Sequence, residues 1–229
     1  DATGLFVAGA EAGSFPNSVR AQVSLEGLTR SGLASVTVLP DPLDRVTVTP
    51  NPGAVRAGEQ LSFAAAGYDQ YGNRLGGLTF AWGATAGGVI SGASGLFTAG
   101  AVAGAYPDAV EATTSLSGRT RTGRATVVVA PGPLDRVVVT PNPALVEAGR
   151  TLQLEASGQD RFGNVIPGLA FVWQETPPRA EEFAMSGTGL IAADTATGAF
   201  ANAVKATTTS EEISKSGSAD VRIVADELV

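Results

Sequence analysis

The sequence predicts an all-β protein made of tandem antiparallel β-sandwich repeats, each about 91 to 94 residues long. Three observations support this fold class: the composition favours strands and turns, a long motif recurs at a fixed offset, and apolar residues alternate with period two. The 3.6-residue periodicity of an amphipathic helix is missing throughout the sequence.

The composition favours short strands separated by tight turns. The chain has 29 glycines and 13 prolines among its 229 residues, and threonine, valine and alanine fill much of the rest. Glycine and proline are favoured in turns, whereas β-branched residues are favoured in strands. The hydrophobic fraction of 44% is sufficient for well-packed cores, so the composition excludes a disordered chain.

A long motif in the first half of the repeat occurs twice. Residues 43–52 (LDRVTVTPNP) return as residues 134–143 (LDRVVVTPNP), at an offset of 91 residues (134 − 43). Residues 67–73 (GYDQYGN) return as residues 158–164 (GQDRFGN) at the same offset. A fixed offset maintained over this length indicates a repeat architecture and defines the repeating unit.

The second half of the repeat occurs three times. It opens with GLF at residues 4–6, GLF at residues 95–97 and GLI at residues 189–191. The last offset is 94 residues (190 − 96), which predicts three extra residues in the third copy, near Pro177 and Pro178.

The chain therefore divides into the C-terminal half of a repeat (residues 1–42), a full repeat (43–133) and a second full repeat (134–229). Because a half-repeat leaves strand edges and a core face uncovered, we expect the chain to be a piece of a longer array. The short proline-containing connectors at residues 40–42 and 131–133 predict a semi-rigid rod in which each repeat contacts mainly its neighbours.

Apolar and polar residues alternate within the predicted strands. Successive side chains of a strand point to opposite faces, so alternation indicates one buried face. About seven strands are expected in each repeat, and antiparallel pairing is favoured because no crossover helix is available. The inward-facing sets are Leu61, Phe63 and Ala65; Leu78, Phe80 and Trp82; Ala125, Val127 and Val129; and Ala219, Val221 and Ile223. The closing hairpins are expected to turn at Glu26-Gly27, Ser117-Gly118-Arg119 and the region of Glu211-Glu212.

Together these motifs (TPNP, YDQYGN, FAW, GLFTAG and a closing ATVVV) resemble bacterial immunoglobulin-like (Big) tandem repeat domains, the modules of invasin- and intimin-type adhesins and other bacterial surface proteins. The resemblance covers nearly the whole chain and implies an immunoglobulin-like β-sandwich. It implies little about function, because one fold serves many purposes. Trp82 and Trp173 resemble the core tryptophan of immunoglobulin strand C, but the cysteine pair of antibody domains is absent because the chain has no cysteine.

The composition also excludes several classes of function. The chain has no histidine and no cysteine, which rules out Ser–His–Asp and Cys–His catalysis and the usual zinc sites. A net charge of −7 without a basic cluster is unsuited to nucleic acid, and no apolar run is long enough for membrane insertion. We therefore expect a protein that is not an enzyme, with no catalytic, cofactor-binding or metal-ligating residues.

Asp69 and Asn73, repeated as Asp160 and Asn164, are the strongest candidates for a metal site. Their side-chain oxygens surround a glycine turn and are of the kind that calcium prefers. Alternatively, each aspartate caps its turn by bonding to nearby backbone, while the glycine and asparagine adopt left-handed conformations. The dense acidic positions of a calcium loop are missing, so the sequence favours the turn cap.

Aromatic residues offer a second set of candidates. Trp82 and Trp173 suit either a sugar-stacking platform or the core, and their parity with Leu78 and Phe80 favours the core. Tyr68 is a surface candidate without an aromatic counterpart. Tyr71 and Phe162 are expected to pack over a sheet end.

Charged side chains gather at the closing hairpins of the two full repeats. The first hairpin carries Arg119, Arg121 and Arg124, and the second carries Glu211, Glu212 and Lys215. A solvated hairpin explains them, and complementary docking between arrays is the alternative.

The expected function is that of a structural repeat in a long extracellular or cell-surface protein, either a stalk or a subunit of a fibre or sheath. The expected partners are the neighbouring repeats of the same chain and, for a fibre, other copies of it. The alternative is a carbohydrate- or ligand-binding accessory module of a secreted enzyme or adhesin.

Overall fold

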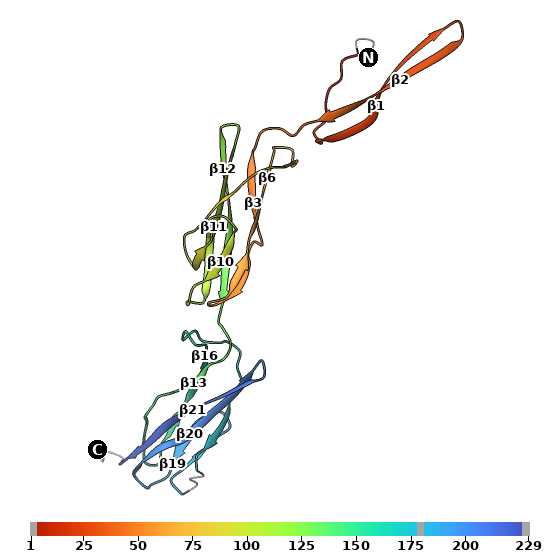
Figure 1. Cartoon of the computed structure of the whole chain (residues 1–229). Coiled ribbons are helices and arrows are strands. Elements are labelled where there is room, and N and C mark those ends of the chain that lie inside the picture. The colour runs from red at the N-terminus through yellow and green to blue at the C-terminus, as the bar shows by residue number, and fades with distance from the viewer. Residues whose placement is uncertain (1–3, 178–180, 226–229) are drawn as a thin grey trace. The chain divides into compact units, whose positions relative to one another are not determined.

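The computed structural model describes residues 4–177 and 181–225, and all their regular structure is β-strand (Figure 1). The chain forms two compact units. The first contains Asp1–Val55, Gln60–Ala99 and Ala105–Val128, and the second contains Arg56–Glu59, Gly100–Gly104 and Val129–Val229. Among the described residues there is no helix of the length and apolarity needed to cross a membrane.

The first unit begins with a two-stranded sheet, β1 (Gly13–Leu25) and β2 (Leu28–Val38). The strands that follow form three small sheets with the orders β3-β6-β7, β5-β10-β9 and β4-β12-β11-β8. Their bounds are β3 (Arg45–Thr49), β4 (Gly53–Arg56), β5 (Gln60–Ser62), β6 (Ala64–Tyr68), β7 (Arg74–Leu75), β8 (Ala81–Ala84), β9 (Gly88–Ile90), β10 (Leu96–Ala99), β11 (Gly104–Leu116) and β12 (Arg119–Ala130).

The second unit repeats this arrangement. Its sheets have the orders β13-β16, β15-β19-β18 and β14-β21-β20-β17. Their bounds are β13 (Arg136–Thr140), β14 (Ala144–Glu147), β15 (Thr151–Gln153), β16 (Glu155–Gln159), β17 (Val172–Glu175), β18 (Phe183–Met185), β19 (Leu190–Ala193), β20 (Gly198–Ser210) and β21 (Ile213–Val224). The architecture is therefore that of immunoglobulin-like β-sandwich repeats, as the sequence predicts.

The strands are more numerous than expected. The stretch 45–130, all of it described, contains ten strands rather than about seven, because the opening strands are interrupted at residues 50–52 and at Phe63. The TPNP segment causes the first interruption, since proline has no N–H to donate to a sheet. Leu78 and Phe80 precede β8 rather than lying within it, although both remain partly buried.

The pairing is not antiparallel throughout, which corrects the expectation from the sequence. Strand β14 runs parallel to β21, with Ala144 opposite Val221 and Val146 opposite Ile223. The TPNP segment ends β13, and the chain then continues beside the last strand in another sheet. Only four residues pair in this way, so the crossover helix that long parallel strands need is not required.

The core consists of the alternating residues that the sequence places on inward faces. Ala125, Val127 and Val129 in β12 are at most 2% exposed. Ala219, Val221 and Ile223, the equivalent residues of β21, have the same burial.

The three closing hairpins turn where the sequence predicts. Both central residues of each turn have positive φ, at Glu26-Gly27, Ser117-Gly118 and Glu211-Glu212. Such turns match the right-handed twist of the flanking strands, which allows long, regular hairpins.

Within the described residues, the β1–β2 hairpin forms a sheet of its own and the core face it carries is open. Phe6 is 50% exposed, whereas its equivalents Phe97 and Ile191 are fully buried. Phe6 and Val38 instead line an open pocket of about 550 Å³. Burying such a side chain contributes about 2–3 kcal/mol, so this hairpin lacks much of the stabilisation of the full repeats.

The same contrast is visible at a glycine in the second strand of each hairpin. A Cβ on Gly217 would lie 2.3 Å from the Val137 carbonyl oxygen, and one on Gly123 would lie 2.6 Å from that of Val46. A Cβ on the equivalent Gly32 would meet nothing within 4 Å. These glycines therefore allow the last strand of each full repeat to approach the first one closely.

Candidate functional site

The repeated Asp-x-x-Gly-Asn turn is the most highly organised polar feature of each unit. In the first unit Asp69 is fully buried at the end of β6. Its Oδ1 accepts the backbone N–H groups of Tyr71 at 2.9 Å and Asn73 at 2.8 Å. Its Oδ2 accepts Asp41 N–H at 2.9 Å and the Asn73 side-chain amide at 2.8 Å. One carboxylate thus caps the turn and holds the connector that precedes the repeat.

The second unit contains the same network around Asp160, which is also fully buried. Its Oδ1 accepts the backbone N–H groups of Phe162 and Asn164, both at 2.9 Å. Its Oδ2 accepts Gly132 N–H at 2.7 Å and the Asn164 side-chain amide at 2.8 Å. The turn cap predicted for both aspartates is therefore present in both units.

The asparagine of each turn extends the network to a loop far away in the sequence. In the first unit Asn73 Oδ1 accepts Ala12 N–H at 3.0 Å, and its Nδ2 donates to the Ala10 carbonyl at 2.7 Å. In the second unit Asn164 Oδ1 accepts Ala103 N–H at 2.9 Å, and its Nδ2 donates to the Ala101 carbonyl at 2.8 Å. Both loops belong, by sequence, to the repeat before the one that carries the turn.

Every residue of the second network is therefore displaced by 91 positions from its counterpart in the first. This also explains why Gly100–Gly104, which the sequence assigns to the repeat 43–133, clusters with the second unit. Sequence reasoning identified the turn but missed the reach of the asparagine. Its partners are backbone groups of alanines, which carry no recognisable sequence pattern.

The hydrogen bonds also determine the charge state of the two carboxyls. Burial disfavours the ionised form, but the donors from Asn73, Asp41 and Tyr71 outweigh it and hold the pKa of Asp69 at about 2. Burial likewise opposes ionisation of Asp160, and the donors from Asn164, Gly132 and Phe162 lower its pKa below the ordinary value. Both groups are carboxylates at neutral pH, and each is saturated by N–H donors.

The calcium alternative is not supported by the donor set of these turns. In the first unit, each oxygen of the Asp69 carboxylate already accepts two N–H groups. The side-chain oxygen of Asn73 accepts a further N–H, that of Ala12 in the neighbouring loop. Within the described residues, no group of three or more acidic, histidine or cysteine side chains is placed to hold a metal ion. The arrangement holds the turn, the connector and the loop together through hydrogen bonds.

The aromatic candidates lie mainly against the cores. Trp173 is half-buried against the core of the second unit, and a Cβ on Gly189 would lie 2.7 Å from its ring. Trp82 has the same relation to Gly95, at 2.8 Å. Phe162 lies beside Gly58 and under the Arg161 guanidinium, whereas Tyr71 is 60% exposed.

Several of the other aromatic and charged candidates each make a separate contact within their repeat. Arg45 lies over the Tyr68 ring. In the first hairpin Arg121 donates to the Asp44 carbonyl at 2.6 Å, and Arg124 pairs with Glu111 at 2.9 Å.

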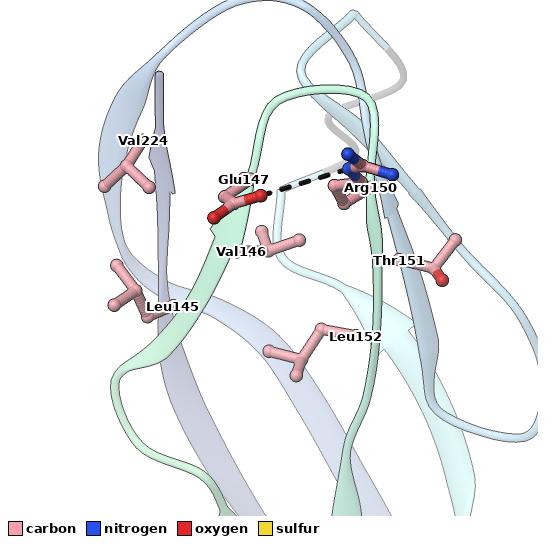
Figure 2. Close-up of a pocket in the computed structure, with 7 residues that line it drawn as sticks. All are labelled: Leu145, Val146, Glu147, Arg150, Thr151, Leu152 and Val224. Atoms are coloured by element: carbon pink, nitrogen blue, oxygen red, sulfur yellow. Dashed lines mark ion pairs between the residues drawn. The ribbon is translucent and has the colours of Figure 1, made fainter. Parts of the chain in front are cut away.

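A shallow pocket of about 270 Å³ lies at the end of the last repeat, beside the turn between β14 and β15 and the end of β21 (Figure 2). Glu147 and Arg150 point toward each other across this turn, with 3.9 Å between Glu147 Oε2 and Arg150 Nε. Leu145 and Leu152 supply apolar surface. In the repeat 43–133, the residues at the same positions are Arg56, Glu59, Ala54 and Leu61.

No family model and no curated protein matches the sequence. Among solved structures, FdeC, an Escherichia coli adhesin, matches with 19% identity and a TM-score of 0.50, over 94% of this chain and 75% of that chain. Mouse cadherin-23 EC22-24 matches with 14% identity and a TM-score of 0.46, over 90% and 73%. The surface-layer protein SbsC, domains 1–6, matches with 17% identity and a TM-score of 0.37, over 91% and 32%. At this identity, the likeness to FdeC shows the fold alone.

Proposed function

We propose that this chain is a non-catalytic structural repeat segment of a long extracellular or cell-surface bacterial protein, of the bacterial immunoglobulin-like type found in invasin- and intimin-type adhesins. The observation that carries the proposal is the Asp–Asn network. It occurs twice, with every partner displaced by 91 residues, and each time it ties a repeat to its connector and to a loop of the repeat before it. A tandem array, in which each repeat contacts only its neighbours, depends on such joints.

The comparison with known structures supports a surface location. The chain resembles in fold the adhesin FdeC over most of its length.

The location is tested with antibodies raised against this chain on intact cells that produce the parent protein. We expect the antibodies to label unpermeabilised cells, and external protease to remove the label without lysing the cells. Labelling only after permeabilisation would contradict the proposal.

Stalk and fibre differ in self-association, which light scattering and electron microscopy measure over a range of concentrations. A monomer at all concentrations supports a stalk. Filaments or ordered bundles that grow with concentration support a fibre or sheath. Clear hits on a glycan array, lost on substitution of an exposed side chain, would instead support a carbohydrate-binding accessory module.

A further inference from the structure

We infer that the end face of the last repeat, residues 145–150 together with 194–197, is a docking site for a further repeat that carries its own Asp–Asn turn and a basic hairpin. The inference rests on the proposed function as a tandem array and adds the chemistry of the partner. The experiment below measures docking and not location, so the two can fail separately.

The matching end face of the preceding copy shows what such a site binds. Within the second unit, the Asn164 side chain bonds to Ala101 and Ala103, and Phe162 lies over Gly58, whose added Cβ would be 3.0 Å from the ring. Ala57, next to that glycine, is only 4% exposed. This face is therefore covered by the Asp–Asn turn of the repeat that follows.

The last repeat has the same backbone framework at this position. Gly58 N donates to the Gly100 carbonyl at 3.2 Å, and Gly149 N donates to the Asp194 carbonyl at 3.2 Å. Matching bonds of 2.9 Å join Ala57 N to the Ala130 carbonyl and Ala148 N to the Val224 carbonyl. The site therefore exists before any partner arrives, so little conformational entropy is lost on docking.

What differs is that nothing covers this face among the described residues. A Cβ on Gly149 would meet nothing within 4 Å, and Leu145 is 57% exposed. Asp194 and Thr197 are exposed as well, whereas their counterparts Gly100 and Ala103 are half-buried. By position, the Thr195 carbonyl corresponds to the Ala101 carbonyl, which accepts a hydrogen bond from Asn164 Nδ2. The Thr197 N–H corresponds to the Ala103 N–H, which donates to Asn164 Oδ1. Because these are backbone groups, the change from alanine to threonine preserves the hydrogen-bonding pattern.

Charge selects between possible partners. Arg56 pairs with Glu211 at the hairpin tip of the following repeat. Glu147 takes the place of Arg56 in the last repeat, so a partner with an acidic tip would face a like charge. A basic tip such as that of residues 117–121, which includes Arg119 and Arg121, complements it. The occupant is thus a repeat of the 43–133 kind rather than of the 134–229 kind.

The test uses the chain extended by one repeat. Residues 1–224 are followed by a second copy of residues 40–133, which places Pro40 of the copy at the position of Ala225. Hydrogen exchange followed by mass spectrometry is then read at residues 145–150 and 194–197, whose sequences occur only once in the extended protein. We expect exchange at both segments to slow by about tenfold or more relative to the original chain, because both become covered and the Thr197 N–H gains an acceptor.

Variants in the appended copy identify the contacts. Asn73→Ala in the copy should restore fast exchange at Thr197 while leaving the copy folded. Closing-hairpin peptides 104–130 come from both the original repeat and the copy, and they would lose half of their protection if the copy unfolded. Ser117→Arg in the copy should slow exchange at residues 145–150 further than Ser117→Glu does, and about 0.5 M salt should reduce this difference because it screens surface charges. Unchanged exchange at both segments beside a folded copy would overturn the inference. Equal protection by the two Ser117 variants at low salt would overturn its charge selectivity.

Discussion

Replacing Asp160 with alanine should unfold the second unit more readily than any other single change in its turn. The substitution removes the acceptor of three backbone N–H groups, those of Gly132, Phe162 and Asn164. A buried donor left without a partner costs about 1–3 kcal/mol. Phe162 is 41% exposed, so water will satisfy part of the freed turn. We therefore expect a loss of about 3 kcal/mol in the free energy of unfolding rather than the sum of three full penalties.

The assay is urea unfolding followed by tryptophan fluorescence in a Trp82→Phe background, so that only Trp173 reports. With a slope of about 1–3 kcal/mol per molar urea, the expected loss lowers the midpoint by about 1–3 M. Hydrogen exchange should show faster exchange at Gly132, whose N–H loses the Asp160 carboxylate as its acceptor. Glu155→Ala is the matched control, because Glu155 is an exposed carboxylate in neighbouring β16.

A loss below about 1 kcal/mol for Asp160→Ala, equal to that of Glu155→Ala, would refute the reasoning, since ordinary surface substitutions stay within about 0.5 kcal/mol. It would mean that water replaces the carboxylate at all three donors. The Asp–Asn network would then be a consequence of the fold and not one of its supports.

Three further changes test other parts of the structure. Gly217→Ala should cost about 1–3 kcal/mol because its Cβ meets the Val137 carbonyl, whereas Gly32→Ala, in open space, should be neutral or slightly stabilising by urea unfolding. Thr208→Val should cost about 1 kcal/mol in the same assay, since its buried hydroxyl donates to a carbonyl at 2.7 Å. For Asp69, the folded pKa of about 2 lies below the unfolded value of about 4. Its contribution to stability is therefore complete above pH 4 and disappears as the pH falls toward 2, so Asp69→Asn should flatten the acid limb of a stability–pH profile.

Much of the fold follows from local patterns in the sequence. The alternation in β12 and β21 and the positions of the hairpin turns depend on neighbouring residues, and the 91-residue offset is visible by comparing short motifs. The structure has all three. The parallel pair of β14 with β21 was not predicted, because a four-residue strand after TPNP carries no mark of its partner. The reach of Asn164 to Ala101 was missed for the same reason, since one end of each bond is backbone.

The Asp–Asn networks also decide how the joints should respond to divalent cations. A calcium ion at Asp160 would have to displace N–H donors that already occupy both carboxylate oxygens, and an exchange of that kind gains little. Any ion that binds the folded chain would raise its melting temperature in proportion to the logarithm of its concentration. We therefore expect thermal unfolding to be the same with a chelator and with about 5 mM calcium, a concentration above the weakest affinities of extracellular calcium modules. A melting temperature that rises with calcium, and loses that rise in Asn164→Ala, would mean that these turns are ligand sites after all.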